Sequence, residues 1–301
     1  MWAVSLILGN MDIVPQLVVN SVIAGSLYAL IAMSFNLVFG ATRFFNLSHG
    51  VLGAVAAYTV FYVGITLKLP LVVAIIGGVV VGAAVGYGLE RLIYRPLRKR
   101  GASSLVLLVA SLGAFTAIEA VIAILFTSQF RTLSTLIGPT GSLNLGGGIM
   151  TYVQVAMFSS AVGVLILLWL LLSRTSFGRA VRAVSDDEEV AKIVGIDTNK
   201  IIGLIFIVGS AIAALAGIFA GIDTGIEPRM GFILLLKGVI AAIIGGMGSV
   251  YGGFLGAFIL GFAENFGIWH ISGEWKDAIA FVILLIFLLF RPQGILGKKR
   301  A

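Results

Sequence analysis

The sequence predicts an all-α polytopic integral membrane protein with about 8–10 transmembrane helices, nine being the preferred number. The chain is 59% hydrophobic and only 11% charged, whereas soluble domains carry about a quarter charged residues. Apolar stretches recur from end to end, each about as long as a helix needs to be to cross the hydrocarbon core. The ten-residue alternating segments of a transmembrane barrel do not occur.

The apolar stretches divide the chain into candidate spans, and we expect residues 1–301 to form a single transmembrane domain. The seventh and ninth spans are short for a full crossing, so a broken or re-entrant helix is an alternative there. The N-terminus lacks the basic region of a cleaved signal peptide, so we interpret it as part of the mature chain. The predicted spans are 14–39, 44–66, 69–89, 103–127, 151–172, 200–221, 232–248, 251–270 and 276–291.

Clusters of basic residues between the spans predict the orientation. Residues 91–100, 174–200 and 298–300 are rich in Lys and Arg, and such loops stay on the cytoplasmic side. Nine crossings connect these clusters consistently and place the N-terminus and the loop 128–150 outside. The same placement explains the net charge of +7 without a nucleic-acid partner.

Two parts of the chain show a weak internal similarity. Residues 45–90 contain His49-Gly50 and end in Glu90, while residues 233–264 contain Lys237-Gly238 and end in Glu264. Aligning Gly50 with Gly238 gives two units that run in opposite directions, the arrangement of an inverted transporter repeat. Chance similarity between Gly- and Ala-rich helices is the alternative.

One segment resembles a soluble protein, because ten charged residues fall within positions 174–200. Ser185 and Glu188 have the spacing of a capping box, Lys192 is placed for a last turn, and Gly195 can end a helix. We therefore expect a short helix over 186–194. Its apolar residues recur at helical spacing, and they predict either docking of a partner or packing on the chain's own membrane domain: Phe177, Val181, Val184, Ala191 and Val194.

Several kinds of chemistry have no motif here. The chain contains no G-x-x-x-x-G-K-[ST], no H-E-x-x-H and no cysteine, so we expect neither ATP hydrolysis by this chain nor a metal site. The glycine run at 245–252 is better explained by close helix packing or a tight turn. Ser48 and His49 are adjacent, so they point in different directions on a helix and do not form a nucleophile and its base. We expect no enzyme activity and no cofactor.

Polar residues in or near the spans are the candidates for a translocation pathway or gate, with structural hydrogen bonds or ion pairs as the alternative. Asn46 can cap the second span and His49 follows in its first turn. Lys237 can snorkel, and Glu90 and Glu264 can lie at the membrane interface. The pathway candidates are Asn46, His49, Glu119, Lys237 and Glu264.

Motifs spread over nearly the whole chain give a more specific indication. They are N-L-S-H-G at 46–50, E-R-x-x-Y-R-P-L-R at 90–98, G-R-A-x-R-A from Gly178 with A-x-x-x-G-I after it, the glycine run at 245–252 and P-x-G-I-L-G near the C-terminus. Together they resemble the permease subunits of branched-chain amino acid ABC importers, of the shorter type.

The resemblance implies a permease for branched-chain or other neutral amino acids in the cytoplasmic (inner) membrane of a prokaryote, working by alternating access. Its expected partners are a second permease (a related longer chain), two cytoplasmic ATPases that use ATP and Mg, and an extracytoplasmic binding protein. Residues 174–199 would be the coupling segment. Its expected coupling residues are Gly178, Arg179, Arg182, Asp186, Asp187, Glu188, Ala191, Gly195 and Ile196.

Two alternatives remain open at the level of the sequence. Urea or short amides are possible cargoes of the same kind of permease. A stand-alone channel or secondary carrier is the other alternative, although it leaves the charged segment 174–199 without a role.

Overall fold

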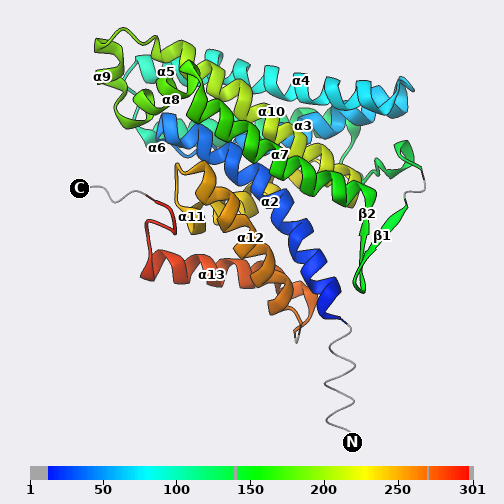
Figure 1. The fold of residues 1–301 in the computed structure, drawn as a ribbon. Helices are drawn as coiled ribbons and strands as arrows, with labels where there is room; N and C mark the ends of the chain where they lie inside the picture. Colours follow the sequence, from blue (N-terminus) through cyan, green and yellow to red (C-terminus); the bar gives the residue numbers. More distant parts are fainter. Residues whose placement is uncertain (1–12, 139–140, 270, 298–301) are drawn as a thin grey trace, which may run out of the picture.

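The computed structural model describes residues 13–138, 141–269 and 271–297, and in these ranges the protein consists mainly of long helices (Figure 1). The first half contains α2 (Val14–Thr42), α3 (His49–Phe61), α4 (Leu71–Leu89), α5 (Arg95–Lys99) and α6 (Ser104–Phe126). The second half contains α7 (Tyr152–Arg174), α8 (Ser176–Asp186), α9 (Glu188–Ile193), α10 (Thr198–Thr224), α11 (Met230–Gly245), α12 (Val250–Gly267) and α13 (Lys276–Phe290). Short π-helical turns at Tyr62–Thr66 and Glu90–Tyr94 extend α3 and α4.

The preferred number of nine crossings is not matched. In the described residues six helices are long and apolar enough to cross a membrane: α2, α3 with its π turn, α4 with α5, α6, α7 and α10. The seventh and eighth predicted spans form α11 and α12, which are bent by 111° and make at most one further crossing. Gly246 (φ 113°) and Gly248 (φ 82°) permit this bend, because only glycine adopts such angles without strain.

The central helices of each half of the chain pack against helices of the other half. Helix α2 packs against α11 and α12, which lie far away in sequence, while α10 packs against α3 and α4. Small residues allow the close approach; a methyl group on Gly217 of α10 would overlap Gly53 of α3. The helices thus form two units of three, α2–α4 and α10–α12. The first helix of each unit packs against the second and third helices of the other unit.

The register of the predicted repeat is different in the structure. Helices α3 and α11 begin at His49 and Met230, so Gly50 corresponds to Gly231. These two glycines also touch each other, whereas Gly238 lies against Ile31 of α2. The alignment of Gly50 with Gly238 is thus wrong by two helical turns, because apolar helices of similar composition give few marks by which to fix a register.

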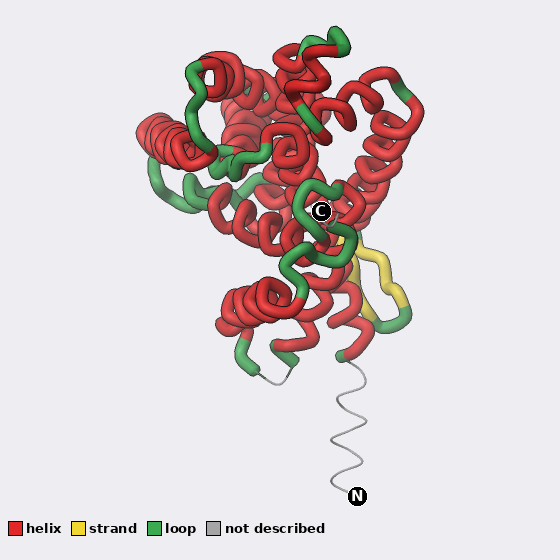
Figure 2. Tube along the Cα trace, turned by 90° about the vertical axis from the view of Figure 1, so that its left-hand side faces the viewer, coloured by secondary structure: helices red, strands yellow, loops and turns green. Residues whose placement is uncertain are grey.

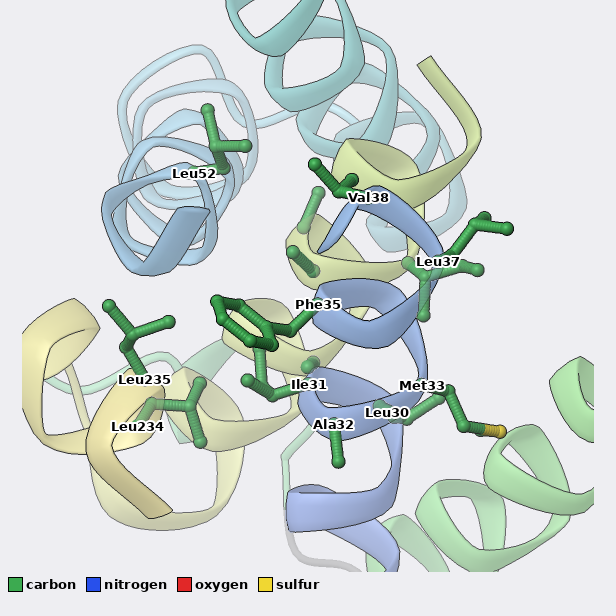
Figure 3. Packing of buried hydrophobic residues seen from close by; sticks show 14 of the residues in the cluster. Leu30, Ile31, Ala32, Met33, Phe35, Leu37, Val38, Leu52, Leu234 and Leu235 are labelled. Carbon is green, nitrogen blue, oxygen red and sulfur yellow. The ribbon is translucent and has the colours of Figure 1, made fainter. Parts of the chain in front are cut away.

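The core surrounds α2, whose middle portion is buried on all sides. Leu30, Ile31, Ala32 and Met33 are fully buried, as expected for a helix that is apolar all round. Figure 3 shows these residues with Phe35 beside Leu52 of α3 and Leu234 and Leu235 of α11. Helices α4, α6 and α7 are instead mostly exposed and apolar, which suits contact with lipid.

The two ends of the molecule differ. Helices α5, α8 and α9 gather at one end, and a hairpin lies at the other (Figure 1); Figure 2 looks from the α8–α9 end. The hairpin pairs β1 (Ser142–Leu145) with β2 (Gly148–Thr151) in antiparallel register, Ser142 opposite Thr151. Two of the three predicted basic clusters, 91–100 and 174–200, lie at the α8–α9 end, and the third, 298–300, falls outside the described residues.

Candidate functional site

The stretch from Asn46 to Gly50 connects four helices. The His49 ring is fully buried, and its Nε2 lies 2.8 Å from Ser34 Oγ on α2. Ser48 points elsewhere, with its Oγ 2.6 Å from the hydroxyl of Tyr94. The two side chains thus point in different directions, as their adjacent positions predicted.

Asn46 does not cap α3. Its side-chain oxygen accepts hydrogen bonds from Ser48 Oγ at 2.8 Å and from the Tyr94 hydroxyl at 3.2 Å, and α3 begins at His49 without a side-chain cap. The Leu47 amide would be the first amide of a helix capped by Asn46. It instead donates to Ser111 Oγ of α6 at 3.0 Å. Tertiary partners therefore replace the local cap.

Gly50 completes this connection on the α11 side. A methyl group on Gly50 would overlap the Gly231 carbonyl, and one on Gly231 would lie 2.6 Å from the Gly50 carbonyl oxygen. The backbones of α3 and α11 thus touch directly. We call residues 46–50 the entry segment; it is held by α2, α6, α11 and the π turn after α4.

Lys237 and Glu264 form a buried ion pair, with Lys237 Nζ 2.7 Å from Glu264 Oε1. The Tyr28 hydroxyl donates to Glu264 Oε2 at 2.8 Å, and Asp277 Oδ1 lies 2.7 Å from the same lysine nitrogen. The ammonium of Lys237 is therefore paired inside the protein, and Glu264 is fully buried. An ammonium in an apolar setting needs such partners, since an unpaired charge there is costly.

The remaining acidic candidates occupy other places. Glu90 is buried and binds Arg98 through both carboxylate oxygens, Nη1 donating to Oε2 at 3.0 Å. Glu119 on α6 is half-buried and lies 3.8 Å from Arg229 Nε, just before α11. In the described residues no hydrogen bond or ion pair joins Glu119 to the entry segment or to Lys237, so the five pathway candidates form three separate groups.

The glycine run and the C-terminal motif form one structural unit. Residues 246–249 make the tight turn between α11 and α12, and Asn36 of α2 binds this turn by accepting from the Gly248 amide at 2.9 Å. The C-terminal segment then donates from Ile295 N to Ile244 O at 3.0 Å and from Leu296 N to Gly245 O at 2.8 Å. These bonds satisfy the last carbonyls of α11. The tight-turn interpretation of the glycine run is confirmed.

Helix α8 is fixed where it leaves α7. Thr175 Oγ1 accepts from the Gly178 amide at 3.1 Å and caps the helix. A methyl group on Gly178 would overlap the carbonyls of Leu171 and Leu172, so only glycine allows this close corner. Arg182 reinforces it by donating to Leu172 O. At its far end α8 is tied to α2, because Arg43 donates to Ser185 O at 2.6 Å.

The short helix predicted over about 186–194 forms as α9 (Glu188–Ile193), but it starts two residues later than predicted. Ser185 lies inside α8, Asp186 ends that helix, and Asp187 is the cap of α9, accepting from the amides of Glu189 at 2.8 Å and Val190 at 3.0 Å. The capping box from Ser185 is therefore wrong by two residues. Asp187 is preferred because the amphipathic run that starts at Ser176 carries α8 past Ser185.

The end of α9 agrees with the sequence. Gly195 has φ 85°, its amide donates to Lys192 O at 3.0 Å, and the Ile196 amide donates to Ala191 O at 3.0 Å. This pair of bonds is the Schellman motif, in which a glycine ends a helix. The prediction that Gly195 ends the helix is confirmed.

The apolar residues of α8 and α9 divide into two faces. Val181, Val184 and Ala191 are buried against the chain's own helices, which supports the own-domain alternative for that face. A second face remains open, because Val190, Ile193 and Val194 are 54%, 83% and 68% exposed. We call these three residues the α9 apolar face. Sequence reasoning missed it as a set, although the i, i+3, i+4 spacing was a usable signal.

Tyr28, Ser34, Tyr94 and Asp277 are further polar partners that the sequence did not single out. Each becomes a partner only through contacts with distant parts of the chain, so no local pattern could identify them. Among the residues that the structure describes, no group of three or more His, Cys, Asp or Glu side chains could hold a metal ion.

Comparison with known proteins gives consistent matches. Residues 17–288 match the family model described as a permease component of branched-chain amino acid transport systems. The chain is 35% identical to the high-affinity branched-chain amino acid transport permease protein BraD of Pseudomonas aeruginosa, over 94% of this chain and 95% of that protein. It is 32% identical to LivH of Escherichia coli, with 94% and 95% covered, and 28% identical to a probable LivH of Methanocaldococcus jannaschii, with 92% and 91% covered.

Proposed function

The chain belongs to the family of branched-chain amino acid transport permeases, and from this premise we propose that it is the membrane-spanning subunit of an ABC importer for branched-chain amino acids. Its six or seven apolar helices provide the membrane part. The family membership and the α9 apolar face together carry the proposal, since a transport subunit without an ATP-binding motif needs a surface through which ATP-driven motion reaches it.

We propose that α8 and α9 are the coupling segment. The segment is tied at its start by Thr175 and Arg182 and at its middle by Arg43, so it moves together with α7 and α2. The α9 apolar face is left free for a partner. Because α8 is fixed to α7 and α2 and the α9 apolar face is exposed, the segment is suited to transmit the closure of two ATPase subunits to the membrane helices.

The proposed assembly places this chain in the cytoplasmic membrane of a prokaryote. A second permease subunit, a related longer chain, completes the pathway, and two cytoplasmic ATPases use ATP and Mg to drive it. An extracytoplasmic binding protein delivers the amino acid at the hairpin end. This chain itself binds no cofactor in the proposal.

Four of the five pathway candidates, all except Glu119, hold the moving helices rather than the cargo. The entry segment, Lys237 and Glu264 are buried inside one subunit and have protein partners. We propose that the cargo passes between the two permease subunits, past small and apolar side chains. Weak contact with the cargo favours release, because conduction requires entry without trapping.

The α9 apolar face supplies the test of coupling. Ile193→Ser should remove most ATPase co-purification and binding-protein-dependent leucine uptake, because apolar residues at the centre of an interface carry much of its binding energy. The control is Leu296→Ser, which changes an apolar residue that is 46% exposed and lies outside the segment. Normal co-purification and uptake with Ile193→Ser would contradict the coupling assignment.

The cargo is tested separately with the assembled importer. Excess unlabelled isoleucine or valine should compete with leucine uptake, whereas urea and acetamide should not. Competition by urea alone would instead support the amide-carrying alternative.

A further inference from the structure

A polar cavity of about 350 Å³ lies between the end of α4 and the start of α10. Arg91 and Arg95 line it from the α4–α5 side, and Lys200 lines it from α10. Tyr87, Leu204 and Ile207 form its apolar part. We call this cavity the α4–α10 pocket. The end of α4 and the start of α10, between which it lies, are at the α5 and α8–α9 end of the molecule (Figure 1).

The charges of the pocket do not balance. Glu90 is already bound through both oxygens by Arg98, and Asp197 caps α10 by accepting from the Lys200 amide at 3.1 Å. Within the described residues, the side chains of Arg91, Arg95 and Lys200 have no hydrogen bond or ion pair, and Arg95 Nε is also buried. Three cations thus line the cavity beside two acids, of which Glu90 is neutralised by Arg98 and Asp197 caps α10. Positive charge is in excess, which is an arrangement for an anion.

The local backbone explains why these cations converge. The π-helical turn at Glu90–Tyr94 turns Glu90 inward and is followed directly by α5, and π turns of this kind often occur at functional sites. Arg91 and Arg95 are four residues apart and so share a helix face. On the opposite wall Gly203 lets α10 approach Tyr87, because a methyl group at Gly203 would lie only 3.1 Å from the Tyr87 ring.

We propose that the α4–α10 pocket binds the phosphate headgroup of an anionic phospholipid from the cytoplasmic leaflet. The surroundings favour a lipid over a soluble anion, because Leu92 and Leu204 beside the cations are 77% and 37% exposed. The α4–α5 span beside the pocket is mostly exposed and apolar, as expected for a helix that contacts lipid. Basic pockets between transmembrane helices on the cytoplasmic side hold such headgroups. This inference does not depend on the transported cargo.

Native mass spectrometry of the full chain in detergent tests the proposal with two probes, dioleoylphosphatidylglycerol and dioleoylphosphatidylcholine. The wild-type chain should retain the anionic lipid selectively. Arg95→Gln with Lys200→Gln should lower that retention about 25-fold, since each cation near an anionic headgroup contributes roughly fivefold. The matched control, Lys99→Gln with Arg100→Gln, removes the same charge from the same end outside the pocket and should retain the lipid.

Other outcomes overturn the proposal. Equal loss in both double variants would show a general charge effect. Displacement of the lipid by millimolar inorganic phosphate would show a site for a free anion. Unchanged lipid retention together with loss of ATPase co-purification would show a site for a protein partner. Because Lys200 is exposed, the single variant Lys200→Glu provides a second measurement if the double variant fails to fold, and unchanged lipid retention in it would also overturn the proposal.

Discussion

Lys237 lies within the membrane domain, between one buried and one exposed carboxylate. Glu264 is fully buried, whereas Asp277 is 71% exposed at the start of α13. The lysine therefore links α11, α12 and α13 at one point, and Tyr28 brings in α2 through the same glutamate. A buried ion pair adds little net stability by itself, but removal of one partner is costly because the other charge stays buried.

Glu264→Gln should lower the thermal-unfolding midpoint of the purified chain. The cost should stay below the roughly 3–5 kcal/mol of a wholly unpaired buried charge, because Asp277 still pairs with Lys237. The double variant Lys237→Met with Glu264→Gln should recover much of that loss, because it removes the lysine's charge as well and Gln can still accept from Tyr28. Single and double variants that melt at the same temperature would contradict the ion-pair account.

Gly231→Ala should destabilise the chain by about 1–3 kcal/mol, the usual cost of overpacking a close contact. Its added methyl group would meet the backbone of Gly50, which cannot move without shifting α3. Gly113→Ala is the matched control, since nothing lies within 4 Å of a methyl group there. Thermal unfolding of both variants checks this, and equal midpoints would show that α3 and α11 do not depend on the glycine contact.

At the scale of elements, α9 depends on its cap. The helix has only six residues and would not be stable alone. Asp187 starts it and Gly195 ends it, so the position of the α9 apolar face is determined by these two residues together with the buried Ala191.

Asp187→Ala should weaken ATPase binding by loosening α9, since the loss of such a cap costs about 1 kcal/mol. Asp187→Ser retains a capping oxygen and should preserve co-purification of the ATPases. Ser185→Ala should also be silent, because that side chain caps nothing in the structure. A defect in Ser185→Ala with none in Asp187→Ala would restore the capping box that the sequence alone suggested.

The sequence predicted elements well where the signal is local. The six long helices follow from apolar length, and the end of α9 follows from Gly195. It failed where contacts between distant parts of the chain determine a side chain's partners. Asn46 binds Tyr94 and does not cap a helix, and Lys237 pairs with the buried Glu264. Two features lower the count of nine crossings. The α11–α12 bend depends on the packing of the glycine turn against Asn36 rather than on apolar length, and the ninth predicted span forms α13, which has only 15 residues.

At the scale of the whole molecule, each half of the chain depends on the other half to bury its long central helix. Helix α2 cannot be buried without α11 and α12, and α10 cannot be buried without α3 and α4. Movement of α8 and α9 therefore reaches both halves, since the segment is joined to α7 and α10 and is tied to α2 by Arg43.

The predicted orientation can be tested cleanly, because the chain has no cysteine of its own. A membrane-impermeant maleimide should label Ser142→Cys in right-side-out membrane vesicles. Lys192→Cys should react only after the vesicles are opened, because the basic clusters place α9 in the cytoplasm. The reverse labelling pattern would invert the topology and remove α9 from reach of the ATPases.

Reconstituted transport tests the central claim most directly. Liposomes containing this chain, its partner permease and the ATPases, supplied with the binding protein, should accumulate leucine only when ATP is present. Ile193→Ser should abolish that accumulation without preventing insertion of the chain. Leucine uptake by this chain alone, without ATP and without ATPases, would contradict the account and make the protein a stand-alone carrier.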